Sequence, residues 1–149
     1  MRRKTEFRLE IDPPTATAQE KQVRVVCGHP QFYEKSAAKE AKKLLIAELT
    51  KYKPEQPLQG PIRLCVDWFF PKRKIDKFIG IKLKDTKPDT DNLQKGLKDC
   101  MTKVGFWKDD AQVALEHVAK WWTSGMPGIQ ITMEELEVAR CQTWTQSKK

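Results

Sequence analysis

The chain has 149 residues, a length that fits one globular domain built around a single core. Hydrophobic residues make up 39% of it and charged residues 32%, a balance that excludes the composition of a disordered chain. Lysine and arginine number 28 against 20 aspartate and glutamate residues, so the formal net charge is +8. This charge attracts a polyanion. Nucleic acid is favoured over a membrane, because no lipidation signal or basic amphipathic helix is visible.

The chain shows no pattern typical of secretion, membrane insertion or zinc binding. Residues 5–12 alternate charged and apolar side chains, unlike the apolar core of a signal peptide, and no apolar run approaches membrane-spanning length. The four cysteines, at positions 27, 65, 100 and 141, include no Cys-x-x-Cys pair. We therefore expect a cytoplasmic protein that has reduced thiols, binds no membrane and uses no organic cofactor.

The first predicted elements, in chain order, are two strands, a helix and a third strand. Residues 7–11 alternate apolar and charged side chains as in a half-buried strand, and residues 23–27 predict a second strand that pairs with it. From Ser36 to about Tyr52 apolar residues recur at helical spacing, which predicts an amphipathic helix packed on a sheet. Residues 62–70 form the clearest strand, since every second residue is apolar and would lie on one face.

A basic segment follows and leads to the second helix. Residues 72–87 contain seven lysine or arginine residues and two aspartates, so the segment is either a solvated loop or an arm that grips phosphates. The second helix is predicted to begin just after Pro88 and to end near Gly105. Residues 113–122 and 129–133 then predict two strands joined by a glycine-containing turn, which indicates a closing hairpin.

This order of elements predicts an α+β fold. We expect a two-layer sandwich in which a mixed, mostly antiparallel sheet carries two main helices on one side. A single domain is expected over residues 1–149, with its core at about 5–135 and a polar C-terminal tail at about 139–149. No internal repeat is visible.

Two pairs of acidic residues stand out in this basic chain: Asp89 with Asp91, and Asp109 with Asp110. Magnesium prefers carboxylate oxygens and completes its coordination shell with water and substrate phosphate. Asp91 and Lys95 are one helical turn apart, so a carboxylate and an amine would flank one phosphate. The second pair can join this site only if the fold brings the two pairs together.

The sequence also allows structural roles for the same acidic residues. Asp91 could complement the helix dipole and form a surface ion pair with Lys95. Asp109 and Asp110 could belong to an ordinary turn.

Two motifs surround these aspartates. Residues 87–95 match Lys-Pro-Asp-x-Asp-Asn-Leu-x-Lys, and residues 107–113 match Trp-x-Asp-Asp-x-Gln-Val. In these motifs the sequence resembles the RusA family of Holliday junction resolvases, which is found in bacteria and their prophages, and a looser resemblance extends from about Val23 to Glu135. The chain departs from that pattern in two ways: it lacks the histidine that many relatives carry shortly before Lys-Pro-Asp, and its tail after Glu135 is long.

The resemblance implies a homodimeric, magnesium-dependent endodeoxyribonuclease that resolves Holliday junctions by paired symmetric nicks in DNA recombination and repair. Manganese would substitute for magnesium. The family's catalytic, metal-binding aspartates correspond to Asp89, Asp91 and Asp110, and its motif lysine corresponds to Lys95. Asp109 would support the metal ligands from beside them. From its charge, the basic segment is expected to contact DNA through Lys72, Arg73, Lys74, Lys77 and Lys87.

Two other functions remain open. The first is a broader branched-DNA or flap endonuclease, because nothing in the motifs themselves reads a four-way shape. The second is a catalytically silent nucleic-acid-binding protein in which the aspartates are structural.

Overall fold

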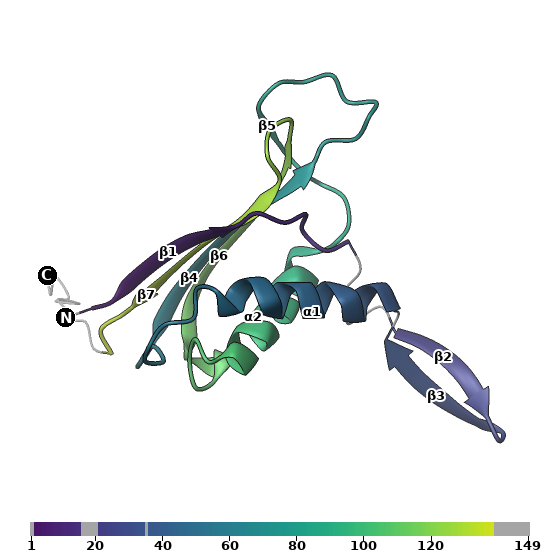
Figure 1. The fold of residues 1–149 in the computed structure, drawn as a ribbon, viewed down its shortest axis with the longest axis horizontal. Helices are drawn as coiled ribbons and strands as arrows, with labels where there is room; N and C mark the ends of the chain where they lie inside the picture. The colour runs from purple at the N-terminus through teal and green to yellow at the C-terminus, as the bar shows by residue number, and fades with distance from the viewer. Residues whose placement is uncertain (1, 16–20, 35, 139–149) are drawn as a thin grey trace, which may run out of the picture.

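The computed structural model describes residues 2–15, 21–34 and 36–138 (Figure 1). In this part of the chain, five strands form the main sheet, two form a separate hairpin, and two long helices lie against the main sheet. The elements are β1 (Lys4–Leu9), β2 (Lys21–Val26), β3 (His29–Glu34), α1 (Ser36–Thr50), β4 (Ile62–Pro71), β5 (Ile81–Leu83), α2 (Thr90–Val104), the 3-10 turn η1 (Asp110–Gln112), β6 (Val113–Thr123) and β7 (Gly128–Glu135).

The main sheet has the strand order β1-β7-β4-β6-β5. Within the described part of this sheet, the pairing of β4 with β6 is parallel and the other three pairings are antiparallel. A parallel pair needs a long crossover, which α2 provides between β4 and β6. Both helices cover the same face of the sheet (Figure 1). The predicted α+β sandwich with a mixed, mostly antiparallel sheet is therefore confirmed.

The core lies between β4 and the two helices. Alternate residues of β4 from Ile62 to Phe70 are buried, as their spacing predicts. Leu97 of α2 and Leu49 of α1 are fully buried against them, and each such leucine contributes about 1.5–3 kcal/mol relative to an exposed side chain. The indole nitrogen of buried Trp68 donates to Gln94 Oε1 at 2.8 Å, which fixes α2 over the strand.

Two predicted strand pairings are wrong. β1 pairs with β7 and not with β2, which forms its own hairpin with β3. The expected hairpin of β6 and β7 does not form either, because β4 lies between them. β4 is buried on alternate residues along its whole length and takes a neighbour on each edge. Side-chain periodicity identifies strands, but it carries no information on which strands become neighbours.

The chain continues from the far end of β4 into a projecting arm, defined here as residues 72–83 (Figure 1). Its last part, β5, pairs with residues 121–123 of β6. The arm extends beyond the part of the sheet that the helices cover. Among the described residues, no helix has the length and apolar character needed to cross a membrane.

Candidate active site

Two lysines hold the segment that leads from the arm into α2. Lys84 is 8% exposed, and its Nζ donates to Thr86 Oγ1 and to the carbonyl of Lys87, both at 2.6 Å. Burial, followed by the nearby positive charges of Lys120 and Arg73, lowers the pKa of Lys84. Lys120 Nζ donates to the carbonyls of Thr86 at 2.7 Å and Pro88 at 2.8 Å. Neither lysine stood out in the sequence, because Lys84 lies among the other cations of the basic segment and nothing local links Lys120 of β6 to the residues before α2.

The chain then enters α2 with Asp89 as the N-cap residue. Its backbone is extended, with φ −73° and ψ 150°, and its side chain makes no capping hydrogen bond. The side chains of Asp89, Asp91 and Lys95 are exposed, and none has a hydrogen bond or ion pair with any residue that the structure describes. The ion pair between Asp91 and Lys95 that a purely structural role suggests is therefore not formed. Both carboxylates remain available to a ligand.

The second acidic pair divides into a structural residue and a free one. Asp109 Oδ1 accepts a hydrogen bond from the Ala111 N–H at 2.9 Å, and Gln112 Oε1 accepts from the Asp109 N–H at 3.1 Å. This reciprocal capping box starts η1. Gln112 Nε2 also donates to the carbonyls of Leu58 and Gly60. Asp110 is half-buried, and its carboxylate has no hydrogen bond or ion pair within the described residues.

The two acidic pairs lie at opposite ends of α2. From Asp91 to the last residue of the helix the rise is about 20 Å. β6 runs the other way beside it, since Lys120 binds the Pro88 carbonyl whereas Asp110 immediately precedes the strand. Among the described residues, no group of three or more His, Cys, Asp or Glu side chains lies close enough to hold a metal ion. One chain therefore does not bring Asp110 to Asp89 and Asp91.

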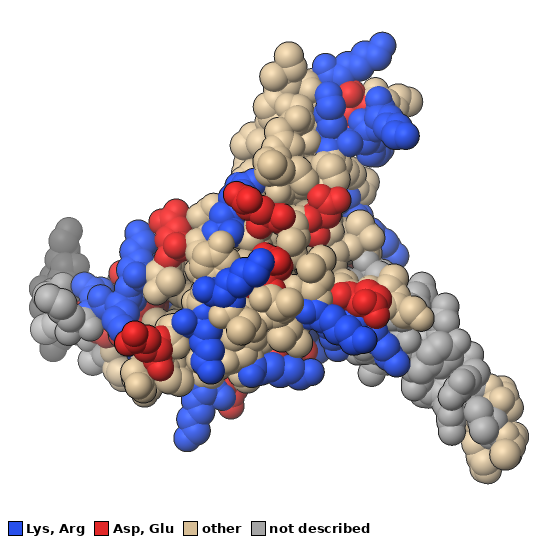
Figure 2. Space-filling view, in the orientation of Figure 1, with Lys and Arg blue, Asp and Glu red and all other residues tan. Residues whose placement is uncertain are grey.

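The basic segment, residues 72–87, contains both structural and free cations. Arg73 forms hydrogen bonds to Asp76, which lower the pKa of that carboxyl group, and its guanidinium lies 5.4 Å from the centroid of the Trp122 ring. Lys72 Nζ donates to the Phe78 carbonyl at 3.3 Å. In contrast, Lys74, Lys77 and Lys87 are exposed and have no partner within the described part of the chain. Figure 2 shows lysine and arginine gathered at the tip of the arm.

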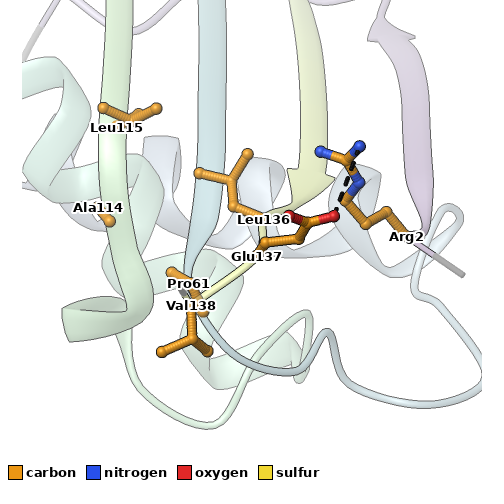
Figure 3. A pocket seen from close by; sticks show the side chains of 7 residues that line it. All are labelled: Arg2, Pro61, Ala114, Leu115, Leu136, Glu137 and Val138. Carbon is orange, nitrogen blue, oxygen red and sulfur yellow. Dashed lines mark ion pairs between the residues drawn. The ribbon is translucent and has the colours of Figure 1, made fainter. Parts of the chain in front are cut away.

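A cavity of about 350 Å³ lies near the start of β6 (Figure 3). Its charged lining residues are Arg2 and Glu137, which form an ion pair at 4.0 Å across one side. The rest of the lining is apolar and includes Leu115 and Leu136. Since it contains no nucleophile and no pair of acidic groups, we do not assign chemistry to this cavity.

Comparison with known proteins identifies the family. The family model described as Endodeoxyribonuclease RusA matches residues 12–134, which is most of the chain. The chain belongs to the RusA family. It is therefore an enzyme that hydrolyses phosphodiester bonds of DNA, and this excludes the catalytically silent alternative. A divalent metal requirement follows from membership of this nuclease family.

Individual relatives are similar to this chain, and two of the three that follow are named as RusA endodeoxyribonucleases. The crossover junction endodeoxyribonuclease rusA of Lactococcus phage r1t is 34% identical over 112 residues, which cover 74% of this chain and 82% of the relative. The uncharacterized protein YqaN of Bacillus subtilis strain 168 is 28% identical over 118 residues, covering 73% and 82%. The crossover junction endodeoxyribonuclease RusA of Escherichia coli strain K12 is 32% identical over 79 residues, covering 53% and 56%.

Proposed function

We propose that this RusA-family enzyme is a Holliday junction resolvase that acts as a homodimer in DNA recombination and repair. It would cut two symmetric phosphodiester bonds and leave 5′-phosphate and 3′-hydroxyl ends. The observation that carries the proposal is that Asp89, Asp91 and Asp110 keep carboxylates without a partner among the described residues of a chain whose net charge is +8. In such a chain a carboxylate can readily find a cationic partner, so three free ones at the motif positions favour a ligand.

The chemistry of these residues fits Mg²⁺, with Mn²⁺ as a substitute, because both are hard cations that take carboxylate oxygens. Asp89, Asp91 and Asp110 would hold the metal. When bound, the metal would lower the pKa of the attacking water and offset charge on the scissile phosphate. Lys95, one turn from Asp91 on the same helix, would neutralise a non-bridging phosphate oxygen. Asp109 would act only by keeping the turn that presents Asp110.

The distance between the two acidic pairs supports a site shared by two subunits. Residues 113–119 of β6 pair with β4 on one edge and have no strand on the other edge within the described residues. Such an edge is a template for another strand, and Leu115 on it is 45% exposed. We propose that two copies pair these edges antiparallel about a twofold axis. Because β6 is antiparallel to α2, the start of one β6 would then lie beside Asp89 and Asp91 of the partner subunit.

A twofold dimer also suits the substrate. The two sites would be related by the same symmetry as two equivalent strands of a four-way junction, which gives paired nicks. The broader branched-DNA or flap endonuclease remains the second candidate. It is favoured by the exposed arm, whose cations contact phosphates without reading a four-way shape.

The test uses a synthetic four-way junction with a mobile core, together with a fork and a linear duplex of matched sequence. We expect symmetric nicks in the junction with Mg²⁺ or Mn²⁺ and none with Ca²⁺, whose looser geometry activates water less. Equal cutting of all three DNAs would instead support the broader nuclease.

The variant Asp91→Asn tests whether Asp91 is a metal ligand. It should abolish cleavage and leave junction affinity in Ca²⁺ unchanged or higher, because the lost carboxylate repels phosphate. Glu40→Gln, which removes one exposed charge from α1, serves as the control and should behave as wild type. If Asp91→Asn cuts within about tenfold of the wild-type rate, a loss below about 1.4 kcal/mol, Asp91 is not a metal ligand.

A further inference from the structure

The arm exposes an unusual set of apolar side chains. Ile75 is 79% exposed and Ile79 is 96% exposed, and both lie in the loop between β4 and β5. Ile81 and Leu83 of β5 are also exposed, as is Met126 in the neighbouring turn between β6 and β7. Exposed apolar residues that cluster on one projection indicate a surface that contacts another molecule. The arm is separated from the helix-covered body of the sheet (Figure 1).

Hydrogen bonds hold the arm in its extended position. The Lys72 N–H donates to the Thr123 carbonyl at 2.9 Å, and the Ser124 N–H donates to the Gly80 carbonyl at 3.0 Å. The Gly80 N–H in turn donates to Ser124 Oγ at 2.8 Å. Gly80 has a φ of 102°, which a side chain would disfavour. These contacts reduce the conformational entropy that ordering Ile75 and Ile79 against a ligand would cost.

The charge around these isoleucines selects the ligand. Residues 72–87 contain seven cations and two aspartates, a net charge of +5. Lys74 precedes Ile75, Lys77 lies between the two isoleucines, and both lysines lack partners among the described residues. A surface that combines exposed aliphatic tips with free cations suits DNA, because the cations meet phosphates while the tips meet the faces of unstacked bases.

The base of the arm is joined to the candidate active site. Lys84 follows β5 directly, and its Nζ binds the Lys87 carbonyl, two residues before Asp89. Lys120 binds the Pro88 carbonyl from the strand that β5 pairs with. These hydrogen bonds connect the base of the arm to the backbone just before Asp89.

We propose that Ile75 and Ile79 form an apolar wedge that enters the centre of branched DNA and unstacks the base pairs at the branch point. The arm lysines hold the flanking phosphates while it does so. The wedge rests on the proposed action on branched DNA, and it adds the element that recognises the branch. Stacked base pairs of duplex DNA resist unstacking, whereas the base pairs at a branch are already weakened.

The experiment compares wild type with the double variant Ile75→Ser/Ile79→Ser. Leu44→Ser on α1 is the control, because Leu44 is 48% exposed and lies outside the arm. A four-way junction with 2-aminopurine at the branch point is bound in Ca²⁺, and fluorescence reports unstacking. We expect wild type and Leu44→Ser to raise the fluorescence on binding, and the double variant to lose most of that rise. The dissociation constant of the double variant should change less than about threefold, because its phosphate contacts remain. Its single-turnover cleavage in Mg²⁺ should fall by tenfold or more.

A full fluorescence rise with the double variant overturns the wedge. A double variant that changes its sedimentation behaviour overturns it as well, because the isoleucines would then contact another copy of the chain. The fluorescence reading requires no cleavage. Wild type that unstacks the junction but never cuts it would therefore refute the proposed function and leave the wedge supported.

Discussion

Subunit mixing tests the shared active site directly. We consider a dimer with one Asp91→Asn subunit and one Asp110→Asn subunit, isolated by two different tags after co-expression. If each site takes Asp91 from one subunit and Asp110 from the other, one site of this dimer carries both substitutions and the other carries neither. If each site lies within one subunit, both sites carry one substitution. The first arrangement restores activity, and the second does not.

The expected activity of the mixed dimer follows from the distance between the two acidic pairs within one chain. Magnesium–oxygen distances are near 2 Å, whereas α2 alone separates Asp91 from the end that leads to Asp110 by about 20 Å. No side-chain rotation closes that gap within one chain. The mixed dimer should therefore show about half of the wild-type concentration of active sites, while each parent dimer has none.

The assay uses a supercoiled plasmid that extrudes a cruciform. Two coordinated nicks give a linear product, whereas a single nick relaxes the plasmid to an open circle. We expect wild type to give linear DNA and the mixed dimer to give open circles. The control is a mixed dimer of Asp89→Asn with Asp91→Asn: these residues lie together at one end of α2, so no intact site forms and no cleavage should return. An inactive Asp91→Asn/Asp110→Asn dimer refutes the shared site, and failure to recover any doubly tagged dimer refutes the homodimer.

Two further predictions concern the arm and the stability of the sheet. Lys74→Gln/Lys77→Gln should reduce the slope of log affinity against log salt concentration by about 2, because about 0.9 fewer counterions are released for each phosphate contact that is lost. The control is Lys39→Gln/Lys43→Gln on α1. An equal slope in wild type and the arm variant would show that the arm does not contact DNA. Glu135→Gln should lower the free energy of unfolding near pH 7 by about 1–2 kcal/mol, a figure reduced for the partial exposure of Arg3. Hydrogen bonds from Arg3 and from the Gln59 N–H lower the pKa of Glu135 from 4.5 to about 2. Its stabilising effect is therefore fully present above about pH 4.5 and is lost as the pH falls towards 2, so urea unfolding of wild type and variant should differ at pH 7 and converge near pH 2. A difference that stays constant over this range would contradict the assigned cause.

Several elements were predictable because their cause is local. The alternating apolar residues of β4 predicted its buried face, and the helix after Pro88 begins at Thr90 and ends before Gly105. Gly105 has a φ of 102°, the left-handed conformation that ends many helices. The apolar residues whose helical spacing predicted α1 are not all buried, since Leu45 is buried whereas Leu44 is 48% exposed.

The features that could not be predicted depend on contacts between distant segments. The insertion of β4 between β6 and β7 is such a feature, and so is the burial of Lys84 beneath the start of α2. The resemblance assigns Asp91 and Asp110 to one site, and the predicted helix lies between them in the sequence, but neither indicated that the two residues stay at opposite ends of that helix within one chain. The number of residues between two aspartates does not give the distance between their carboxylates, which depends on the fold.

The structure also explains why the second motif contains more residues than its chemistry requires. Trp107 is buried, and its indole nitrogen donates to Thr102 Oγ1 at 2.7 Å, which ties the motif to the last turns of α2. Asp109 and Gln112 form the capping box, and Gln112 anchors that turn to the segment before β4. Asp110 alone keeps a carboxylate without a partner among the described residues. Three residues of the motif therefore fix the position of the fourth. This rigidity matters if Asp110 binds a metal ion whose other ligands come from the partner subunit, because the Asp110 carboxylate must then be held accurately across the subunit interface.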